Sequence, residues 1–392
     1  MPKKGNNEGS IYKDKQGHWR GVVTIYTSEG RQKRKFFYGK TKREVTEKVN
    51  QMLNELRTNT YIEPNKTTFY DWLCTWLETY GKADLRPTTS INYETYIHRH
   101  IKPTIGNVKL CDLSVLILQQ FYNERLKNGN LTKKGGLSPK TLRNMHNMIH
   151  KALNQAVFLE MIPKNPADYI TLPKRIKQER KFFTVEEQQK LQSCMKGEKL
   201  EMAVLLDLYT GMRQGELLGL MWKNVHIDLN GQSYLKVTQT LNRIKVDDPD
   251  ATKRTQLKIG IPKTKNSIQT IPLLPDIAQA LYDYKQQQSA YFKENGIKPN
   301  GYVFTNRNGY WVDPRDFQRD FKNLLKKYNI REVNVHGLRH TFATRALESG
   351  MSIKTLSQIL GHSSIHLTLD TYAHVTEDLK IDEMTHLQGF LD

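Results

Sequence analysis

The length and charge of the chain limit the kind of protein it can be. Its 392 residues are enough for two to three domains, and no run approaches the ~20 apolar residues of a membrane span, so we expect no membrane partner. With 60 lysines and arginines against 40 acidic residues, the formal net charge is +20, an excess that points to a polyanion such as nucleic acid.

The cysteines and the N-terminus indicate the compartment. Cys74, Cys111 and Cys194 are well separated, odd in number and without CxxC spacing, which is typical of a reduced protein rather than a disulfide framework. The N-terminal stretch MPKKGNNEGS is basic but lacks the apolar core of a secretory signal. We therefore expect a cytoplasmic protein.

The first predicted unit covers residues 1–62. Between residues 9 and 57 the pattern predicts strands separated by KDKQG and SEG turns, followed by a helix that starts near Thr41. Basic and aromatic side chains crowd this small sheet and are candidates for binding DNA. The alternative is a hairpin with ordinary solvated lysines. The candidate residues are Trp19, Arg20, Arg31, Lys33, Arg34 and Lys35.

Residues 67–170 are predicted to be all helical. The stretch TTFYDWLCTWLETY repeats apolar residues at helical spacing, which favours a core-facing stripe over a ligand site. The stripe consists of Phe69, Trp72, Leu73, Trp76, Leu77 and Tyr80. A second stripe runs from Leu142 to Val157. Residues 171–183 then form a basic linker, in which Lys174, Arg175 and Lys177 either follow a DNA backbone or are simply solvated.

The last unit, residues 184–392, begins with a capping box from Thr184 to Glu187. A helix is then predicted to end at Gly211, which places Arg213 in the following turn. Residues 233–246 and 256–275 indicate a small antiparallel sheet with a turn at KTKN, residues 263–266.

Four chemical groups follow within one short stretch near the C-terminus. In HGLRH, His336 and Arg339 have the spacing of one helical face. In LGH, Gly361 is predicted to end a second helix, and His362 follows it directly. Tyr372 follows ten residues later. Guanidinium groups neutralise a phosphoryl group in transfer, imidazoles carry protons near neutral pH, and a tyrosine can form a reversible covalent phosphoester. The stretch predicts DNA strand transfer through a tyrosine.

These motifs together resemble a known family. HGLRH, LGH and Tyr372, together with a TG-x-R-x-x-E-L segment at 210–217, are similar to the motifs of the tyrosine recombinases, in particular the phage and conjugative-transposon integrases. The resemblance implies a multidomain α+β fold. In such a fold, residues 1–62 form a small three-stranded sheet plus a helix that binds arm-type DNA sites. Residues 67–170 form a helical, SAM-like core-binding domain, and the linker follows. Residues 184–392 form a mainly α catalytic domain with a small antiparallel sheet and a C-terminal tail.

The resemblance also implies how the phosphate is attacked. Tyr372 is the nucleophile and forms a 3′-phosphotyrosine, while Arg213, Arg339 and His362 hold the phosphate and His336 assists as a base or an added donor. The 5′ hydroxyl of a partner strand reverses the reaction, so that neither a metal nor another cofactor is required.

Two supporting roles complete the implied site. Glu216 orients Arg213 without transferring a proton. A lysine of the β-hairpin protonates the departing 5′ oxygen; Lys263 fits best by its distance from Pro272, and Lys265 is the alternative.

The implied partners are double-stranded DNA at the element ends and at the target, three further copies of the chain in a homotetramer, and an excision helper protein. The implied location is the bacterial nucleoid. Residues after Tyr372 have the pattern of a short amphipathic helix that docks either on its own chain or on a neighbouring subunit.

Three other functions remain to be separated. A metalloenzyme using His336 and His340 has the right spacing, but Gly337 stands where the HExxH pattern has its glutamate. A DNA-binding regulator without activity would share the fold, and a type IB topoisomerase would share the chemistry. The extra basic sheet at 9–57 favours an integrase, because it adds a second DNA-binding site.

Overall fold

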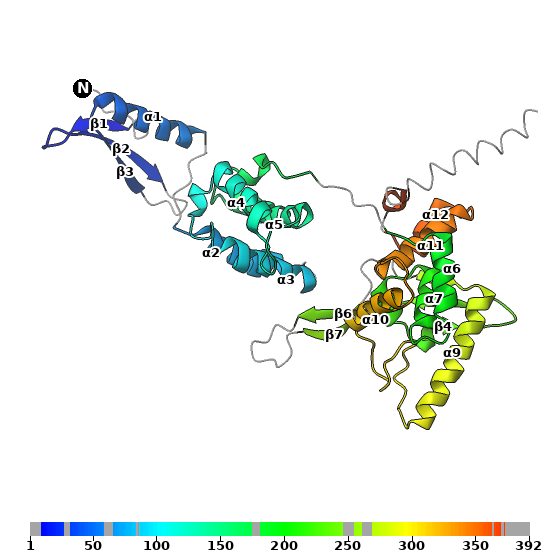
Figure 1. The fold of residues 1–392 in the computed structure, drawn as a ribbon. Coiled ribbons are helices and arrows are strands. Elements are labelled where there is room, and N and C mark those ends of the chain that lie inside the picture. The colour runs from blue at the N-terminus through cyan, green and yellow to red at the C-terminus, as the bar shows by residue number, and fades with distance from the viewer. Residues whose placement is uncertain are drawn as a thin grey trace, which may run out of the picture. The chain divides into compact units, whose positions relative to one another are not determined.

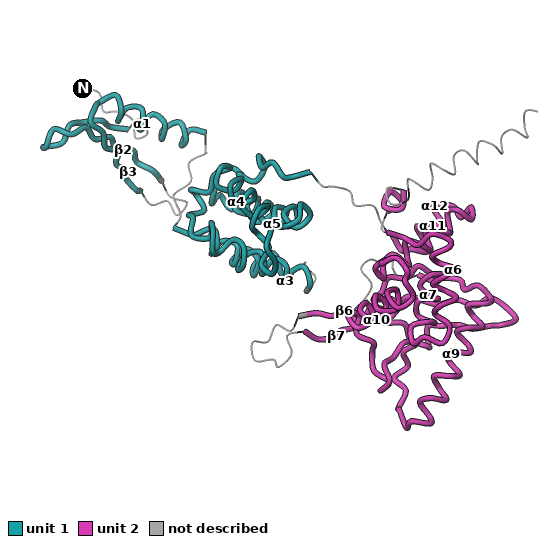
Figure 2. Tube along the Cα trace, in the orientation of Figure 1, with its two compact units in different colours: residues 1–176 teal, residues 177–392 magenta. Residues whose placement is uncertain are grey.

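The computed structural model divides the chain into two units, residues 1–176 and 177–392 (Figure 2). The division lies within the predicted basic linker. The structure describes residues 9–26, 32–58, 66–83, 85, 87–174, 181–245, 255–260, 269–362, 364–369 and 372.

The first unit begins with a three-stranded antiparallel sheet and one helix (Figure 1). The strands β1 (Ser10–Lys13), β2 (Trp19–Tyr26) and β3 (Gln32–Gly39) lie in chain order. Helix α1 (Lys42–Arg57) begins where predicted, because the Thr41 hydroxyl accepts the backbone N–H of Glu44. Their shared core consists of Val23, Ile25, Val45, Val49 and Met52.

Helices with a separate core build the rest of this unit. They are α2 (Phe69–Trp76), α3 (Pro87–Thr95), α4 (Val115–Asn128) and α5 (Pro139–Phe158), with π-helical turns at Leu77–Gly81 and Tyr96–Ile101 and 3₁₀ turns at Leu110–Asp112 and Pro166–Tyr169. The predicted stripe of α2 is buried, and the Trp72 indole donates to the Ala152 carbonyl of α5 at 2.9 Å. Tyr80 is the exception at 42% exposed, because the π-helical turn shifts the helical spacing at its position.

The second unit is mainly helical. Its helices are α6 (Val185–Cys194), α7 (Glu201–Thr210), α8 (Gln214–Leu218), α9 (Pro275–Glu294), α10 (Pro314–Lys327), α11 (His336–Glu348) and α12 (Ile353–Ile359), with a 3₁₀ turn at Trp222–Asn224. The predicted capping box opens α6. The α+β fold class predicted from the sequence is confirmed.

The predicted small sheet is present, but its strands divide between two pairings. Strands β4 (Val225–His226), β5 (Tyr234–Val237) and β8 (Gln269–Pro272) form one antiparallel sheet, while β6 (Thr240–Lys245) and β7 (Thr255–Gly260) form a separate hairpin. Strands β5 and β8 carry buried apolar residues into the core, whereas most of the described side chains of the hairpin stay partly or fully exposed. The predicted KTKN turn lies outside the described residues.

Two apolar clusters form the interior of this unit. The larger one joins α6–α10, β5 and β8. The smaller one lies between α11 and α12 and includes Tyr372, which packs with Ala343, Leu356 and Leu360. Among the described residues, no helix is both long and apolar enough to cross a bilayer.

Candidate active site

Arg213 is fixed by the turn that links α7 to α8. Gly211 ends α7 with φ +60°, and a Cβ there would lie 2.4 Å from the Phe342 ring, so only glycine fits both the backbone and the space. The Glu216 carboxylate, 3% exposed, then accepts the Arg213 backbone N–H at 2.9 Å and its Nη1 at 2.8 Å. Nη2 of Arg213 donates to the Gly361 carbonyl at 3.0 Å.

Arg339 lies in the first turn of α11 and is 2% exposed. Its Nη1 donates to the Gly211 carbonyl at 2.8 Å and its Nη2 to the Leu360 carbonyl at 2.7 Å. The two arginines therefore donate to adjacent carbonyl groups at the end of α12, Arg339 to Leu360 and Arg213 to Gly361. Burial, with the nearby positive charge of Arg213, lowers the pKa of Arg339 to about 10, as expected of two like charges held close together.

Gly337 shows why HGLRH cannot serve as an HExxH motif. A Cβ at this position would meet Val333 Cγ1 at 2.0 Å and the Lys181 carbonyl oxygen at 2.8 Å. No side chain fits there, least of all the glutamate that such a motif needs.

His336, His340 and Tyr372 contact one another in sequence along α11, whereas His362 contacts Thr368. His336 is exposed at the start of the helix, and its ring centroid lies 4.7 Å from that of His340. Nδ1 of His340 and the Tyr372 phenol oxygen are hydrogen bonded at 2.9 Å, and Tyr372 is 2% exposed. Nδ1 of His362 is hydrogen bonded to the buried Thr368 hydroxyl at 2.8 Å.

Sequence reasoning missed two residues of this cluster. It considered His340 only as a metal ligand and did not consider Thr368. For His340 a signal existed, since it follows Arg339 directly and lies one helical turn after His336. For Thr368 nothing in the local pattern distinguishes it from its neighbours.

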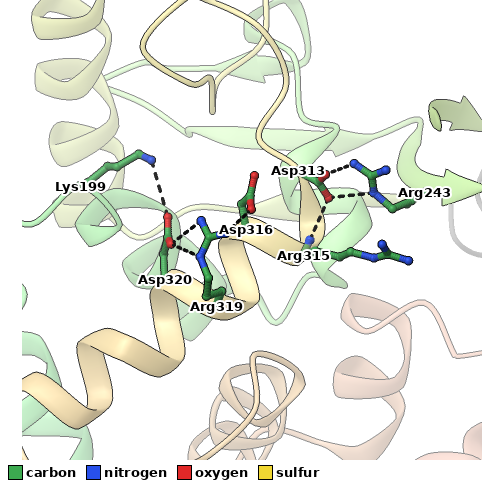
Figure 3. Close-up of polar contacts among 7 residues, drawn as sticks. All are labelled: Lys199, Arg243, Asp313, Arg315, Asp316, Arg319 and Asp320. Atoms are coloured by element: carbon green, nitrogen blue, oxygen red, sulfur yellow. Dashed lines mark hydrogen bonds and ion pairs between the residues drawn. The ribbon is translucent and has the colours of Figure 1, made fainter. Parts of the chain in front are cut away.

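Lys263 and Lys265 lie outside the described residues, but the hairpin of β6 and β7 is anchored to the start of α10. Arg243 of β6 forms a two-pronged ion pair with Asp313, which also caps α10 by accepting the Arg315 N–H (Figure 3). Figure 3 also shows Arg319 held by Asp316 and Asp320, so this arginine is already paired within α10.

The candidate DNA-binding residues of the N-terminal sheet lie on its two opposite faces, because side chains alternate along each strand. Arg20 lies opposite Tyr38, and Arg34 lies opposite Thr24, on the face away from α1. Phe36 and Tyr38 are exposed on the same face. Trp19, Lys33 and Lys35 share the other face, in register with the core residues Val23 and Ile25. Arg31, Arg175 and Lys177 lie outside the described residues, and Lys174 is exposed.

A buried carboxyl group lies near Arg339. Asp207 of α7 is 1% exposed, and neither of its carboxylate oxygens has a hydrogen-bond partner among the described residues. Burial raises the pKa of Asp207 well above its ordinary range; Arg339 opposes the rise and Glu216 adds to it.

Substituting this carboxyl is expected to stabilise the protein at alkaline pH. In the folded protein the raised pKa lets Asp207 keep a proton that it releases in the unfolded chain. The free energy of unfolding therefore falls as the pH rises from the carboxyl pKa of the unfolded chain to the raised pKa of the folded one. Asp207→Asn should therefore gain about 1–3 kcal/mol at pH 8, and the gain should shrink toward pH 4. Urea denaturation at both pH values measures it, with the exposed Asp283→Asn of α9 as control. An equal gain at both pH values would contradict the explanation.

The chain is similar in sequence to a family of known proteins and to several of its members. Residues 181–378 match the phage integrase family, and residues 68–126 match the N-terminal SAM-like domain of phage integrases. A XerC-like tyrosine recombinase of Caldanaerobacter subterraneus subsp. tengcongensis is 30% identical over 99% of both chains. The transposase from transposon Tn916 of Enterococcus faecalis is 27% identical over 65% of this chain and 63% of its own.

One solved structure extends the similarity to three dimensions. The Tn1549 transposon integrase in complex with a circular intermediate DNA has a TM-score of 0.66 and 25% identity, and the match covers 82% of this chain and 99% of that one.

Proposed function

Because this chain belongs to the phage integrase family, we propose that Tyr372 attacks a DNA phosphodiester while Arg213, Arg339 and His362 hold the phosphate. The chain is a tyrosine-type site-specific recombinase, and it integrates and excises a mobile element such as a conjugative transposon or a prophage. Its substrate is double-stranded DNA.

The observation that supports this assignment best is the pair of guanidinium groups. Arg213 and Arg339 are held by carbonyl groups and Glu216 before any substrate arrives. Their mutual repulsion is relieved when an anion binds between or beside them, and the donors not used by these bonds match the oxygens of a phosphate. Such prepared charge acts where negative charge develops in the transition state.

The strand transfer then proceeds in two balanced steps. The Tyr372 phenol gives its proton to His336 as the base and its oxygen bonds to phosphorus, the P–O5′ bond breaks, and the departing 5′ oxygen receives a proton from Lys263, or from Lys265 in its place. In the second step the 5′ hydroxyl of a partner strand gives its proton to the lysine and attacks the 3′-phosphotyrosine, the bond from phosphorus to Tyr372 breaks, and the released phenolate takes back its proton from His336. Bond energy is conserved, so neither ATP nor a metal is needed. His336, exposed at the start of α11, adds a donor or base at the phosphate.

The other parts of the chain position the DNA. The outer face of the N-terminal sheet, where Arg20 and Arg34 lie with Phe36 and Tyr38, combines cations with aromatic rings and suits an arm-type DNA site. The helical domain at 67–170 and the linker with Lys174, Arg175 and Lys177 bind the core site.

Exchange of two duplexes requires four strand cleavages, which favours a homotetramer on the DNA. The residues after Tyr372 lie outside the described part of the chain; in this proposal, which rests on their sequence alone, they dock either on a neighbouring subunit or on their own chain. An excision helper protein sets the direction of the reaction, and the protein acts at the nucleoid.

A two-duplex joining assay tests the function. An element-end duplex and a second labelled duplex, mixed with the protein in EDTA, are expected to yield hybrid strands. Relaxation of supercoiled DNA without hybrid strands would identify a type IB topoisomerase instead. Tight binding without any cleavage would identify a regulator.

A further inference from the structure

We propose that His340 is the positioning residue of the nucleophile: its imidazole holds the Tyr372 phenol in the active site of its own chain. This inference rests on the proposed function of Tyr372. It adds to the predicted site a histidine that none of the assigned roles includes.

The contact itself is a buried hydrogen bond. Nδ1 of His340 lies 2.9 Å from the phenol oxygen, the histidine is 9% exposed and the tyrosine 2% exposed. A phenol buried without a polar partner is unfavourable, so this bond fixes where the oxygen points. The ring centroids, 5.9 Å apart at 63°, pack edge to face and restrict rotation of the tyrosine further.

The histidine is in turn held by its own helix. It follows Arg339 directly in α11, and the Arg339 guanidinium is bonded to carbonyl groups at the ends of α7 and α12. Its other neighbour along the helix face is His336, whose ring meets it at 74°. One turn of α11 thereby carries both Arg339, the proposed phosphate ligand, and His340, which holds the nucleophile Tyr372. The distance between the guanidinium group and the phenol is therefore set by the geometry of the helix.

Tyr372 also lies within electrostatic reach of that ligand. Among the charges around Arg339, ionised Tyr372 acts to raise the pKa of the guanidinium, against the lowering effect of burial. The phenol that His340 holds is therefore close enough to Arg339 for the two charges to interact. Apolar packing against Ala343, Leu356 and Leu360 holds the rest of the ring.

The test compares two substitutions that differ in hydrogen bonding. His340→Leu fills the space but cannot bond the phenol, whereas His340→Asn places an amide near the position of Nδ1. The rate of covalent adduct formation on a nicked duplex should fall about 100-fold in His340→Leu, since a displaced reacting group loses about that much. His340→Asn should recover to within about tenfold of the parent protein. DNA affinity should be unchanged in both.

A modified substrate separates positioning from proton delivery. With sulfur in place of the bridging 5′ oxygen the leaving group needs no acid, so the substrate should rescue Lys263→Ala but leave His340→Leu slow. Wild-type rates in His340→Leu, or equal defects in the Leu and Asn variants, would overturn the proposal. Adduct formation by the parent protein is measured first, and its absence would instead refute the assignment of Tyr372.

Discussion

A Tyr372→Phe variant is expected to bind element-end DNA with the affinity of the parent protein and to form no covalent adduct. The substitution removes only the phenol oxygen, the one atom that bonds to phosphorus in the proposed reaction. Loss of a nucleophile typically lowers a rate by at least about 10⁴-fold, which places cleavage below detection on a denaturing gel. The exposed Tyr282→Phe of α9 is the matched control and should cleave normally.

The same substitution should affect folding little. The ring remains packed in the cluster between α11 and α12, and the loss is the hydrogen bond to His340, about 1 kcal/mol. Loss of DNA binding in step with unfolding would mean that the phenol has a structural role. A persistent adduct in Tyr372→Phe would assign the chemistry to another residue.

The second large effect is expected at Arg339. In Arg339→Lys the positive charge is kept, but a single ammonium cannot reproduce the forked bonds to the Gly211 and Leu360 carbonyls. The rate of adduct formation should fall about 1,000-fold, the scale on which a prepared transition-state donor acts. Stability should fall by about 3 kcal/mol, because buried carbonyls lose their partner and a buried ion loses its geometry.

Single-turnover cleavage on saturating DNA and urea denaturation measure the two effects separately. Arg319→Lys on α10 is the control, since that arginine is 61% exposed and paired with Asp316 and Asp320. A stable Arg339→Lys variant that cleaves at the rate of the control would remove Arg339 from the phosphate site.

Local chemistry made much of this architecture predictable. The capping residues Thr41 and Thr184, the glycine stop at Gly211 and the motif spacing in α11 each depend on a few neighbouring residues. Helical periodicity likewise identified the buried stripe of α2. These features follow from backbone sterics and from one helical repeat, which are present in the sequence itself.

Tertiary pairing explains what could not be predicted. The sequence of the N-terminal sheet does not reveal that Arg20 and Arg34 lie on one face and Lys33 and Lys35 on the other, because that depends on strand register. The contact between His340 and Tyr372 joins residues 32 positions apart. Local sequence also gave no sign that Asp207 would be buried near Arg339 with no hydrogen-bond partner among the described residues.

The central claim is that Tyr372 becomes covalently joined to DNA, and peptide mapping of the adduct tests it most directly. The parent protein is incubated in EDTA with an end-labelled nicked duplex, digested with protease, and the labelled DNA–peptide is sequenced by mass spectrometry. The account predicts one peptide that carries a 3′-phosphotyrosine at Tyr372. A labelled peptide linked through any other residue, or an adduct that forms only when a metal ion is supplied, would contradict it.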